Sequence, residues 1–313
     1  MKKKTKRLFL FAGYDKDGII DDTLIHYLKV LSALGDIVLV MDCNVKDTSK
    51  LKNIKNILHI ETKRHGEYDF GSYKRAYMWA HDKNLLNKYN WVYLVNDSVY
   101  GPLFDLEPCL IQMESKGVDL IGLTSYHDEY TPVHIQSWFL GLTKKLAASQ
   151  ILLNFMQSIT HRKNKTELVY KYEVGLSRNI LQHGYQMYAF LNLDTSFCSG
   201  NPVYKQPKLL LENFVPFIKK LALTNMVGSV YLLAHTSDTL NQLIFSHAER
   251  TGLKYPRTDI VDQYKKIYRL SLFSIPLCTI YRRTYFRETY YRVYLFDKIR
   301  ILKIEKHDSL TQN

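Results

Sequence analysis

Short, mainly apolar runs alternate with amphipathic stretches along the first half of the chain. The runs have the length expected of strands buried on both faces of a sheet, and they occupy residues 8–12, 37–41, 57–60, 91–95 and 119–124. The amphipathic stretches between them are typical of helices, and they occupy residues 22–34, 72–86 and 106–116. This alternation predicts an α/β fold with a mostly parallel sheet and flanking helices.

The second half of the chain begins in the same way and then changes in composition. An extended segment is expected at residues 134–142, helices near 147–159 and 171–183, and a strand at 185–190. After about residue 205, longer helical stretches rich in basic and aromatic residues follow. We therefore expect a first domain over residues 1–205 and a helical basic and aromatic region over residues 206–313.

Positive charge is abundant and gathers near the C-terminus. The net charge is +13, which favours polyanionic partners. Between Lys265 and Lys306 there are eleven basic and three acidic residues, interleaved with nine aromatic ones. Such a segment suits an anionic membrane surface, although a solvated helical face is an equal alternative. No nucleic-acid-binding motif accompanies the charge, so nucleic acid is not an expected partner.

Cysteine usage and the apolar runs indicate the compartment. The four cysteines are far apart and form no metal-binding or redox spacing, which suggests a reducing environment. The run at residues 8–12 is too short for the core of a signal peptide, and no stretch is typical of a transmembrane helix. We expect a cytoplasmic protein, held peripherally at a membrane if the basic segment binds lipid.

The strand predicted at residues 91–95 ends on the most informative polar residues of the chain. Asn96, Asp97 and Ser98 follow it directly, before a Gly101-Pro102 breaker. Open α/β sheets bind ligands at the carboxyl ends of their strands. A carboxylate there can hold a hard cation with its phosphate ligand, or accept a hydrogen bond from a sugar. An Asx-turn without a binding role is the alternative.

Three further segments carry candidate binding groups. In residues 64–75, two glycines bracket Asp69, whose carboxylate suits ribose hydroxyls, while Arg64 and Lys74 suit a diphosphate. In residues 134–138, alternation in an extended segment places three side chains on one side, where they form a sugar platform or a buried polar row. These three are His134, Gln136 and Trp138.

Glu173 is the candidate for proton transfer. The segment from Lys171 to His183 is predicted to be helical, with Val174 and Leu181 toward the core and Glu173 in the first turn. A glutamate at this place can act as a general base toward a substrate hydroxyl. The alternative is a carboxylate that only stabilises the helix dipole.

Taken together and in order, these segments resemble the rhamnan synthesis protein F family, glycosyltransferases of bacterial surface polysaccharide assembly. The resemblance spans roughly residues 8 to 220. The matching segments are Gly13-Tyr14-Asp15, Tyr68-Asp69-Phe70-Gly71-Ser72-Tyr73-Lys74, Asn96-Asp97-Ser98-Val99-Tyr100-Gly101-Pro102, Gly122-Leu123-Thr124, His134-Ile135-Gln136-Ser137, Tyr172-Glu173-Val174-Gly175-Leu176-Ser177 and Pro216-Phe217-Ile218-Lys219.

The resemblance implies a GT-A-like nucleotide-sugar-binding fold over residues 1–205 and a defined chemistry. A sugar, commonly rhamnose, would pass from a nucleotide donor such as dTDP-rhamnose to a lipid-linked glycan. Asp97 takes the position of the acidic motif that binds donor diphosphate and metal, Mg²⁺ or Mn²⁺, and Glu173 that of the base. Asn96-Asp97-Ser98 offers only one carboxylate instead of the usual Asp-x-Asp, so Lys219, Arg64 or Lys74 is an alternative source of positive charge.

These observations predict an inverting glycosyltransferase on the inner face of a bacterial cell membrane. One acid acts as base and no second carboxylate is visible as a nucleophile, which favours inversion. Two alternatives remain open from the sequence. One is a phosphosugar transferase that uses the same acidic loop, and the other is a non-catalytic membrane-bound assembly scaffold.

Overall fold

The computed structural model of the chain describes residues 5–162, 164–224 and 236–253, together with the strands between residues 263 and 307. Contacts divide the chain into two compact units, Met1–Lys254 and Tyr255–Asn313. The expected division near residue 205 therefore falls inside the first unit. The reason is that residues 207–223 pack onto the sheet of that unit, as described below.

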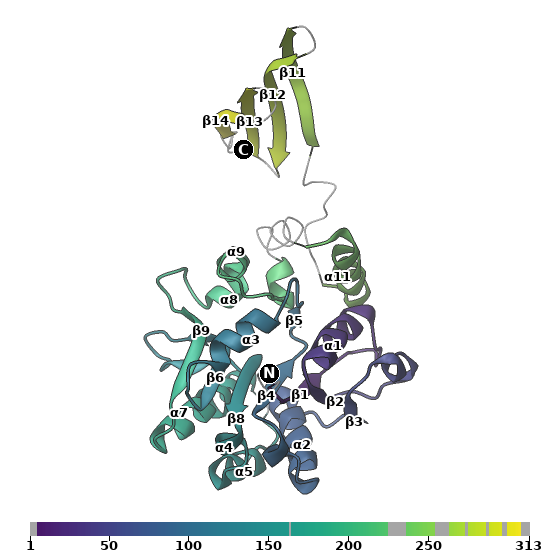
Figure 1. The fold of residues 1–313 in the computed structure, drawn as a ribbon, viewed down its shortest axis with the longest axis vertical. Coiled ribbons are helices and arrows are strands. Elements are labelled where there is room, and N and C mark those ends of the chain that lie inside the picture. Colours follow the sequence, from purple (N-terminus) through teal and green to yellow (C-terminus); the bar gives the residue numbers. More distant parts are fainter. Residues whose placement is uncertain are drawn as a thin grey trace. The chain divides into compact units, whose positions relative to one another are not determined.

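The first unit is built on a twisted sheet in which all but two strands run parallel (Figure 1). The strand order is β3-β2-β1-β4-β8-β6-β7, with β9 paired to β6, and only β8 and β7 run against their neighbours. The predicted α/β fold with a mostly parallel sheet is confirmed. The strands are β1 (Arg7–Gly13), β2 (Asp36–Met41), β3 (Ile57–Thr62), β4 (Trp91–Asn96), β6 (Leu120–Tyr126), β7 (His134–Ile135), β8 (Phe139–Thr143) and β9 (Met187–Leu193).

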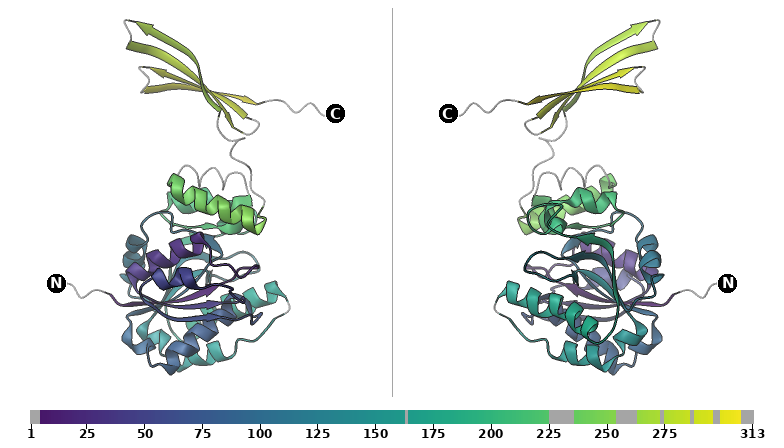
Figure 2. Two further views of the ribbon diagram at one scale, coloured as in Figure 1. Left: turned by 90° about the vertical axis from the view of Figure 1, so that its right-hand side faces the viewer. Right: turned by 90° about the vertical axis from the view of Figure 1, so that its left-hand side faces the viewer.

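The apolar runs place one core on each face of the sheet, because successive side chains of a strand point to opposite faces. In β1, Phe9 and Phe11 join one core, and Leu8 and Leu10 join the other. Helices α1 (Asp22–Leu34) and α3 (Glu107–Glu114) cover the first core. The second core is covered by α2 (Tyr68–Asp82), α4 (Lys144–Ala147), α5 (Gln150–Gln157) and α7 (Gly175–Gln182). Figure 2 shows these two helix layers on either side of the sheet.

Helix α1 forms where capping and periodicity predict it. The Asp21 side chain accepts a hydrogen bond from the Leu24 backbone N–H at 3.1 Å, and the helix ends at Leu34, before Gly35. Helix α2 differs from its prediction, because it begins at Tyr68 rather than at residue 72. Asp69 therefore lies in the first turn of a helix and not in a glycine-bracketed loop.

The segment that contains Glu173 also differs from its prediction. Helix α6 (Lys165–Leu168), a π-helical turn (Val169–Val174) and α7 follow one another without a break. Glu173 thus lies inside a continuous helical run and not at a helix start, so the explanation by the helix dipole does not apply. Single π-helical turns inside α-helices are often found at functional sites.

After residue 205, the chain packs against a core of the first unit instead of forming a separate region. Helices α8 (Pro202–Lys205) and α9 (Pro207–Glu212) lead to β10 (Ile218–Lys219), which pairs antiparallel with β5 (Val99–Tyr100). Phe217, which is fully buried, contacts the rings of Tyr27, Trp138 and Phe139. A short 3₁₀ turn (Lys220–Thr224) and α11 (Asp238–Thr251) follow.

The prediction of a helical C-terminal region is wrong for the described residues between 263 and 307. These residues form an antiparallel sheet in the order β11-β12-β13-β14, with β11 (Gln263–Leu272), β12 (Ile275–Tyr285), β13 (Glu288–Leu295) and β14 (Ile299–His307). The many tyrosine, isoleucine and threonine residues of this segment favour strands, and this preference outweighs the basic residues that suggested helices. Within the described part of the chain, no helix is long and apolar enough to cross a membrane.

An ion pair connects the first residue of β1 with the last residue of α3. Arg7 is 3% exposed, and its Nε and Nη2 atoms donate to the two carboxylate oxygens of Glu114 at 2.6 and 2.9 Å. The Tyr93 hydroxyl donates to the same carboxylate at 2.7 Å. The Glu114 carboxylate is therefore buried, and it is stabilised by the Arg7 guanidinium from β1 and the Tyr93 hydroxyl from β4.

Arg7→Met should lower the free energy of unfolding by about 3–5 kcal/mol, because it leaves the Glu114 charge buried without its partner. The double variant Arg7→Met/Glu114→Gln should recover part of this loss. Urea unfolding measures both. Lys208→Met, which breaks the exposed pair with Glu212, is the control and should cost less than about 1 kcal/mol. Equal losses in Arg7→Met and the control would contradict a buried role for the pair.

Candidate functional site

A cavity of about 310 Å³ opens at the carboxyl edge of the sheet. Strands β2 and β3 follow β1 on one side of it in the sheet, whereas β4 pairs with β1 on its other side. The direction in which strands are added therefore reverses between β1 and β4. Open α/β sheets bind ligands at such a point. The cavity collects seven of the residues predicted from sequence, namely Asp69, Asn96, Asp97, Ser98, Trp138, Glu173 and Lys219.

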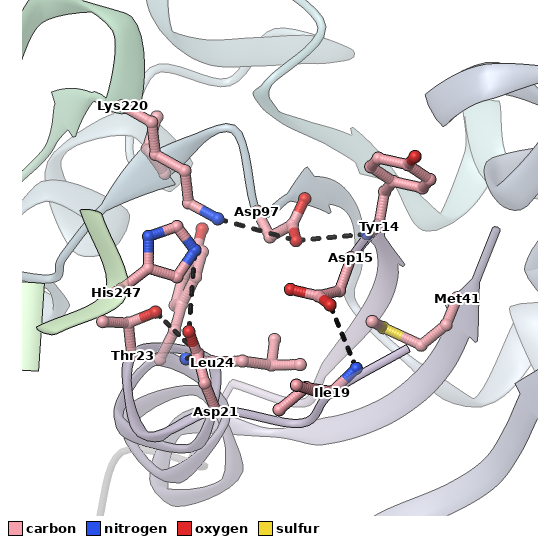
Figure 3. A pocket seen from close by; sticks show the side chains of 12 residues that line it. Tyr14, Asp15, Ile19, Asp21, Thr23, Leu24, Met41, Asp97, Lys220 and His247 are labelled. Carbon is pink, nitrogen blue, oxygen red and sulfur yellow. Dashed lines mark hydrogen bonds and ion pairs between the residues drawn. The ribbon is translucent and has the colours of Figure 1, made fainter. Parts of the chain in front are cut away.

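Asp97 lies where β1 and β4 end side by side. Its backbone N–H donates to the carbonyl of Ala12 at 3.2 Å, and its carboxylate accepts from the Tyr14 N–H at 3.1 Å. The Lys220 amine lies 3.7 Å from the same oxygen (Figure 3). Burial raises the pKa of Asp97, aided by nearby acids, while Lys220 and the Tyr14 N–H act in the opposite direction.

A chain of hydrogen bonds connects the other groups of the β4 loop. The Asn96 amide donates to Asp69 at 2.9 Å, and its oxygen accepts from the Ser98 hydroxyl at 2.5 Å. The Ser98 hydroxyl in turn accepts from the Lys219 amine at 2.7 Å. This network holds Asp69 and Lys219 on either side of Asn96, so α2, β4 and β10 together fix one wall of the cavity.

Glu173 occupies a second wall, contributed by the π-helical turn. One of its carboxylate oxygens accepts hydrogen bonds from both the N–H and the hydroxyl of Ser137, and the other lies 3.4 Å from Nε2 of His134. Burial acts to raise the pKa of Glu173, but the hydrogen bonds from His134 and Ser137 outweigh it, and the pKa lies below its ordinary value. Glu173 is therefore ionised at neutral pH.

His134 is buried and contacts the Glu173 carboxylate. Its Nδ1 faces the Pro132 carbonyl at 3.0 Å while Nε2 faces Glu173, so both ring nitrogens point at acceptors. Burial acts to lower the pKa of His134, but Glu173 and the Pro132 carbonyl more than offset it, and the pKa is raised. The imidazole is buried and does not line the cavity.

Two exposed tyrosines form the rim of the cavity. The side chains of Tyr14 and Tyr68 are 49% and 45% exposed, and both line the opening. Tyr68 has a φ of 58°, an unusual value for a bulky residue at the first position of a helix. Arg64 lies over the Tyr14 ring at 5.2 Å, so a cation faces this rim from outside.

Four residues predicted from sequence do not line the cavity. Arg64 donates to the Asp42 carbonyl at 2.8 Å, and Lys74 donates to the Ile159 carbonyl at 2.7 Å, which ties α2 to the end of α5. Gln136 is buried and accepts from the Thr124 hydroxyl. With His134 behind Glu173, the predicted sugar platform is reduced to Trp138, beside Ser137.

Sequence reasoning missed several residues that line the cavity. Tyr14, Tyr68 and Ser137 lie inside segments that carried the family resemblance, and Lys220 directly follows another. A search of those segments for every polar or aromatic residue would have found them. Tyr204 had no such signal, because α8 reaches the cavity only through tertiary packing.

The carboxylates of this site are a poor fit to a divalent cation. Mg²⁺ and Mn²⁺ require several oxygen ligands. Asp97 is paired with the Lys220 ammonium, and the nearby Asp15 and Asp21 both accept from Arg250, at 2.6 and 3.0 Å. Among the described residues, no group of three or more histidine, cysteine or acidic side chains is arranged to hold a metal.

The comparison with family models decides the family. The model described as rhamnan synthesis protein F matches residues 37–282, well over half of the chain. The chain belongs to the rhamnan synthesis protein F family. The resemblance seen in the sequence motifs is thereby confirmed, and membership in the rhamnan synthesis protein F family supports a glycosyltransferase of polysaccharide synthesis.

This member of the rhamnan synthesis protein F family was also compared with solved structures and with curated proteins. Among solved structures, the chain is similar to a glycosyltransferase involved in the glycosylation of the major capsid of PBCV-1. The identity is 10%, the TM-score is 0.32, and the match covers 69% of this chain and 93% of that chain. No curated protein matches the chain.

His134→Gln should lower the free energy of unfolding by about 1–3 kcal/mol at pH 6, the usual range for a hydrogen bond to a charged group, and by less at pH 9. A raised pKa means that the stabilisation from His134 is present at low pH and lost as the pH rises past that pKa. The lowered pKa of Glu173 keeps its carboxylate charged at both of these pH values.

Urea unfolding at pH 6 and pH 9 measures the difference. His183→Gln, at an exposed position near the end of α7, is the control and should show no comparable pH dependence. A cost of His134→Gln that is equal at both pH values would mean that the ring contributes packing only.

Proposed function

We propose that the protein is an inverting glycosyltransferase with a GT-A-like fold that transfers a sugar from a nucleotide donor to a glycan acceptor. The observation that carries this proposal is one cavity at the switch point of the sheet in which an ionised glutamate faces a polar, lysine-containing loop. A base on one wall and cations on the other suit attack by a hydroxyl with departure of an anionic group.

Glu173 acts as the general base. Its contacts with Ser137 and His134 hold the carboxylate in a fixed orientation and keep it deprotonated. The same contacts make it a weak proton acceptor. The acceptor hydroxyl becomes more acidic as its oxygen bonds to the anomeric carbon, so the proton moves to Glu173 late in the displacement. No other carboxylate of the cavity is needed as a nucleophile, which supports inversion.

The donor lies across the ends of β1 and β4. Asp69 is suited to accept hydrogen bonds from ribose hydroxyls, and the rings of Tyr14 and Tyr68 at the rim are suited to the nucleobase. The Trp138 indole and the π-helical turn then border the space for the transferred sugar and the acceptor. Family membership favours rhamnose as the sugar and a lipid-linked glycan as the acceptor.

The basic C-terminal segment supports a place on the inner face of the bacterial membrane. Eleven basic and three acidic residues between Lys265 and Lys306 give this segment a large excess of positive charge. Anionic headgroups attract such a segment, and a lipid-linked acceptor would be concentrated at the same surface.

Glu173→Gln should still bind nucleotide sugar but should transfer it about 10²–10⁴ times more slowly, the usual contribution of base catalysis. The test is transfer from a set of nucleotide sugars, including dTDP-rhamnose, with separate measurement of donor binding by calorimetry. Glu167→Gln, an exposed glutamate in the same helical run, is the matched control and should transfer at the normal rate.

The nucleotide that the donor releases distinguishes sugar transfer from the alternative functions. Release of a nucleoside diphosphate indicates sugar transfer, whereas release of the monophosphate indicates phosphosugar transfer. Donor binding without turnover of any kind would favour a non-catalytic scaffold. Normal transfer by folded Glu173→Gln would remove this residue from the mechanism.

The parent protein should bind vesicles that contain anionic lipid, bind neutral vesicles poorly, and be released by salt, because screening weakens attraction of about 1 kcal/mol per basic residue. Replacing four arginines by glutamine should abolish vesicle sedimentation and leave transfer to a soluble acceptor analogue unchanged. The four are Arg282, Arg283, Arg287 and Arg292. Binding that persists in high salt would contradict an electrostatic attachment.

A further inference from the structure

Two consecutive lysines line the cavity beside the β4 loop, and only the first was singled out from the sequence. Lys219 ends β10 and Lys220 begins the following 3₁₀ turn. The pairing of β10 with β5, together with a hydrogen bond from the Lys220 N–H to the Ser98 carbonyl at 2.9 Å, fixes the backbone of both. Their positions relative to Asn96-Asp97-Ser98 are therefore set by main-chain contacts.

Lys219 is a buried cation in aromatic surroundings. Its side chain is 6% exposed, and its amine lies 5.2 Å from the ring centre of Trp138 and 5.8 Å from that of Tyr204. Aromatic faces stabilise a cation without neutralising its charge. The Ser98 hydroxyl, at 2.7 Å, orients the amine toward the end of β4.

Lys220 pairs with Asp97 and is more accessible than Lys219. It is 21% exposed, and its amine is 3.7 Å from the carboxylate, longer than a strong hydrogen bond. The same carboxylate oxygen of Asp97 also accepts a hydrogen bond from the Tyr14 N–H. The two amines thus place two positive charges beside the β4 loop at the switch point of the sheet, in a cavity that the carboxylates of Asp69, Asp97 and Glu173 also line.

We propose that Lys219 and Lys220 supply the positive charge that binds the donor diphosphate and stabilises its departure, in place of a divalent cation. This inference rests on the proposed function. A cation with two positive charges at Asp97 would be repelled by the Lys220 ammonium, and the other nearby carboxylates accept hydrogen bonds from Asn96, Ser137 or Arg250. Asp97 then acts as a positioning residue that holds Lys220 toward the diphosphate.

Every bond, electron pair and proton of the transfer step can be accounted for without a metal. The acceptor oxygen forms a bond to the anomeric carbon while the bond from that carbon to the diphosphate oxygen breaks. The electron pair of the broken bond stays on the diphosphate, whose added charge Lys219 and Lys220 stabilise. The proton of the acceptor hydroxyl passes to Glu173.

Binding measurements with and without metal test the inference on the parent protein. Inorganic diphosphate, dTDP and UDP are the probes, titrated by calorimetry in EDTA and again in Mg²⁺ or Mn²⁺. The dissociation constants of those probes that bind should agree within about threefold between the two conditions. A requirement for metal, with binding lost in EDTA, would overturn the inference.

Lysine variants provide the second measurement. Lys219→Gln and Lys220→Gln should each weaken binding of inorganic diphosphate in EDTA by about tenfold or more, the effect of losing one charged contact. Lys220→Arg should retain most of the affinity, since arginine also binds phosphate. Lys50→Gln, at an exposed pair with Asp22, is the control and should bind normally. Normal binding by both folded glutamine variants would overturn the inference.

Asp97→Asn separates a positioning role from a metal-binding one. Its transfer rate should fall because Lys220 is no longer held, whereas its affinity for inorganic diphosphate in EDTA and in Mg²⁺ should stay equal. An affinity that depends on Mg²⁺ in the parent and not in Asp97→Asn would identify a metal ligand and overturn the inference.

The same assays keep failure of the inference apart from failure of the proposed function. Sugar transfer that stops in EDTA overturns the lysine assignment and leaves the glycosyltransferase function in place. Metal-free diphosphate binding without transfer of any sugar supports the lysine assignment and contradicts the proposed function.

Discussion

The parallel pairing of β1 with β4 is the constraint on which the rest of the site depends. Its register runs from Arg7 opposite Trp91 to Ala12 opposite Asn96, so both strands end at the same level of the sheet. Tyr14 and Asp97 therefore meet just beyond the ladder, two residues after Ala12 and one after Asn96. A slip by one residue would turn every apolar side chain of β1 to the other core, so the buried pattern on both faces fixes the register.

The second requirement is that charged groups remain buried beside a cavity. Asp97 and Glu173 are partly buried and Lys219 is buried, and each has partners that limit the cost of burial. These partners come from elements distant in sequence, such as Ser137 for Glu173. These contacts hold the charged side chains on each wall of the cavity, and they favour a preorganised site over one that forms around its ligand.

Much of the fold and part of the site could be predicted from the sequence, for physical reasons that differ among the residues. Asp97 could be found because a buried strand and the polar loop after it are local features. His134 could be singled out, but its location behind Glu173 could not, because tertiary packing decides which side of a short strand faces a cavity. The C-terminal strands were missed because basic residues are compatible with helices and strands alike, and the tyrosine, isoleucine and threonine residues between them favour strands.

The closing of the cavity by β10 has a consequence for the order in which the enzyme is made. The Lys219 amine contacts Ser98, 121 residues earlier in the chain, and Phe217 fills the core between α1 and β8. On the ribosome, the strands from β1 to β9 emerge before the segment that completes the cavity wall. The central sheet can therefore assemble while the nascent chain still lacks both lysines, and the wall of the cavity that they line is completed only after β9 has emerged.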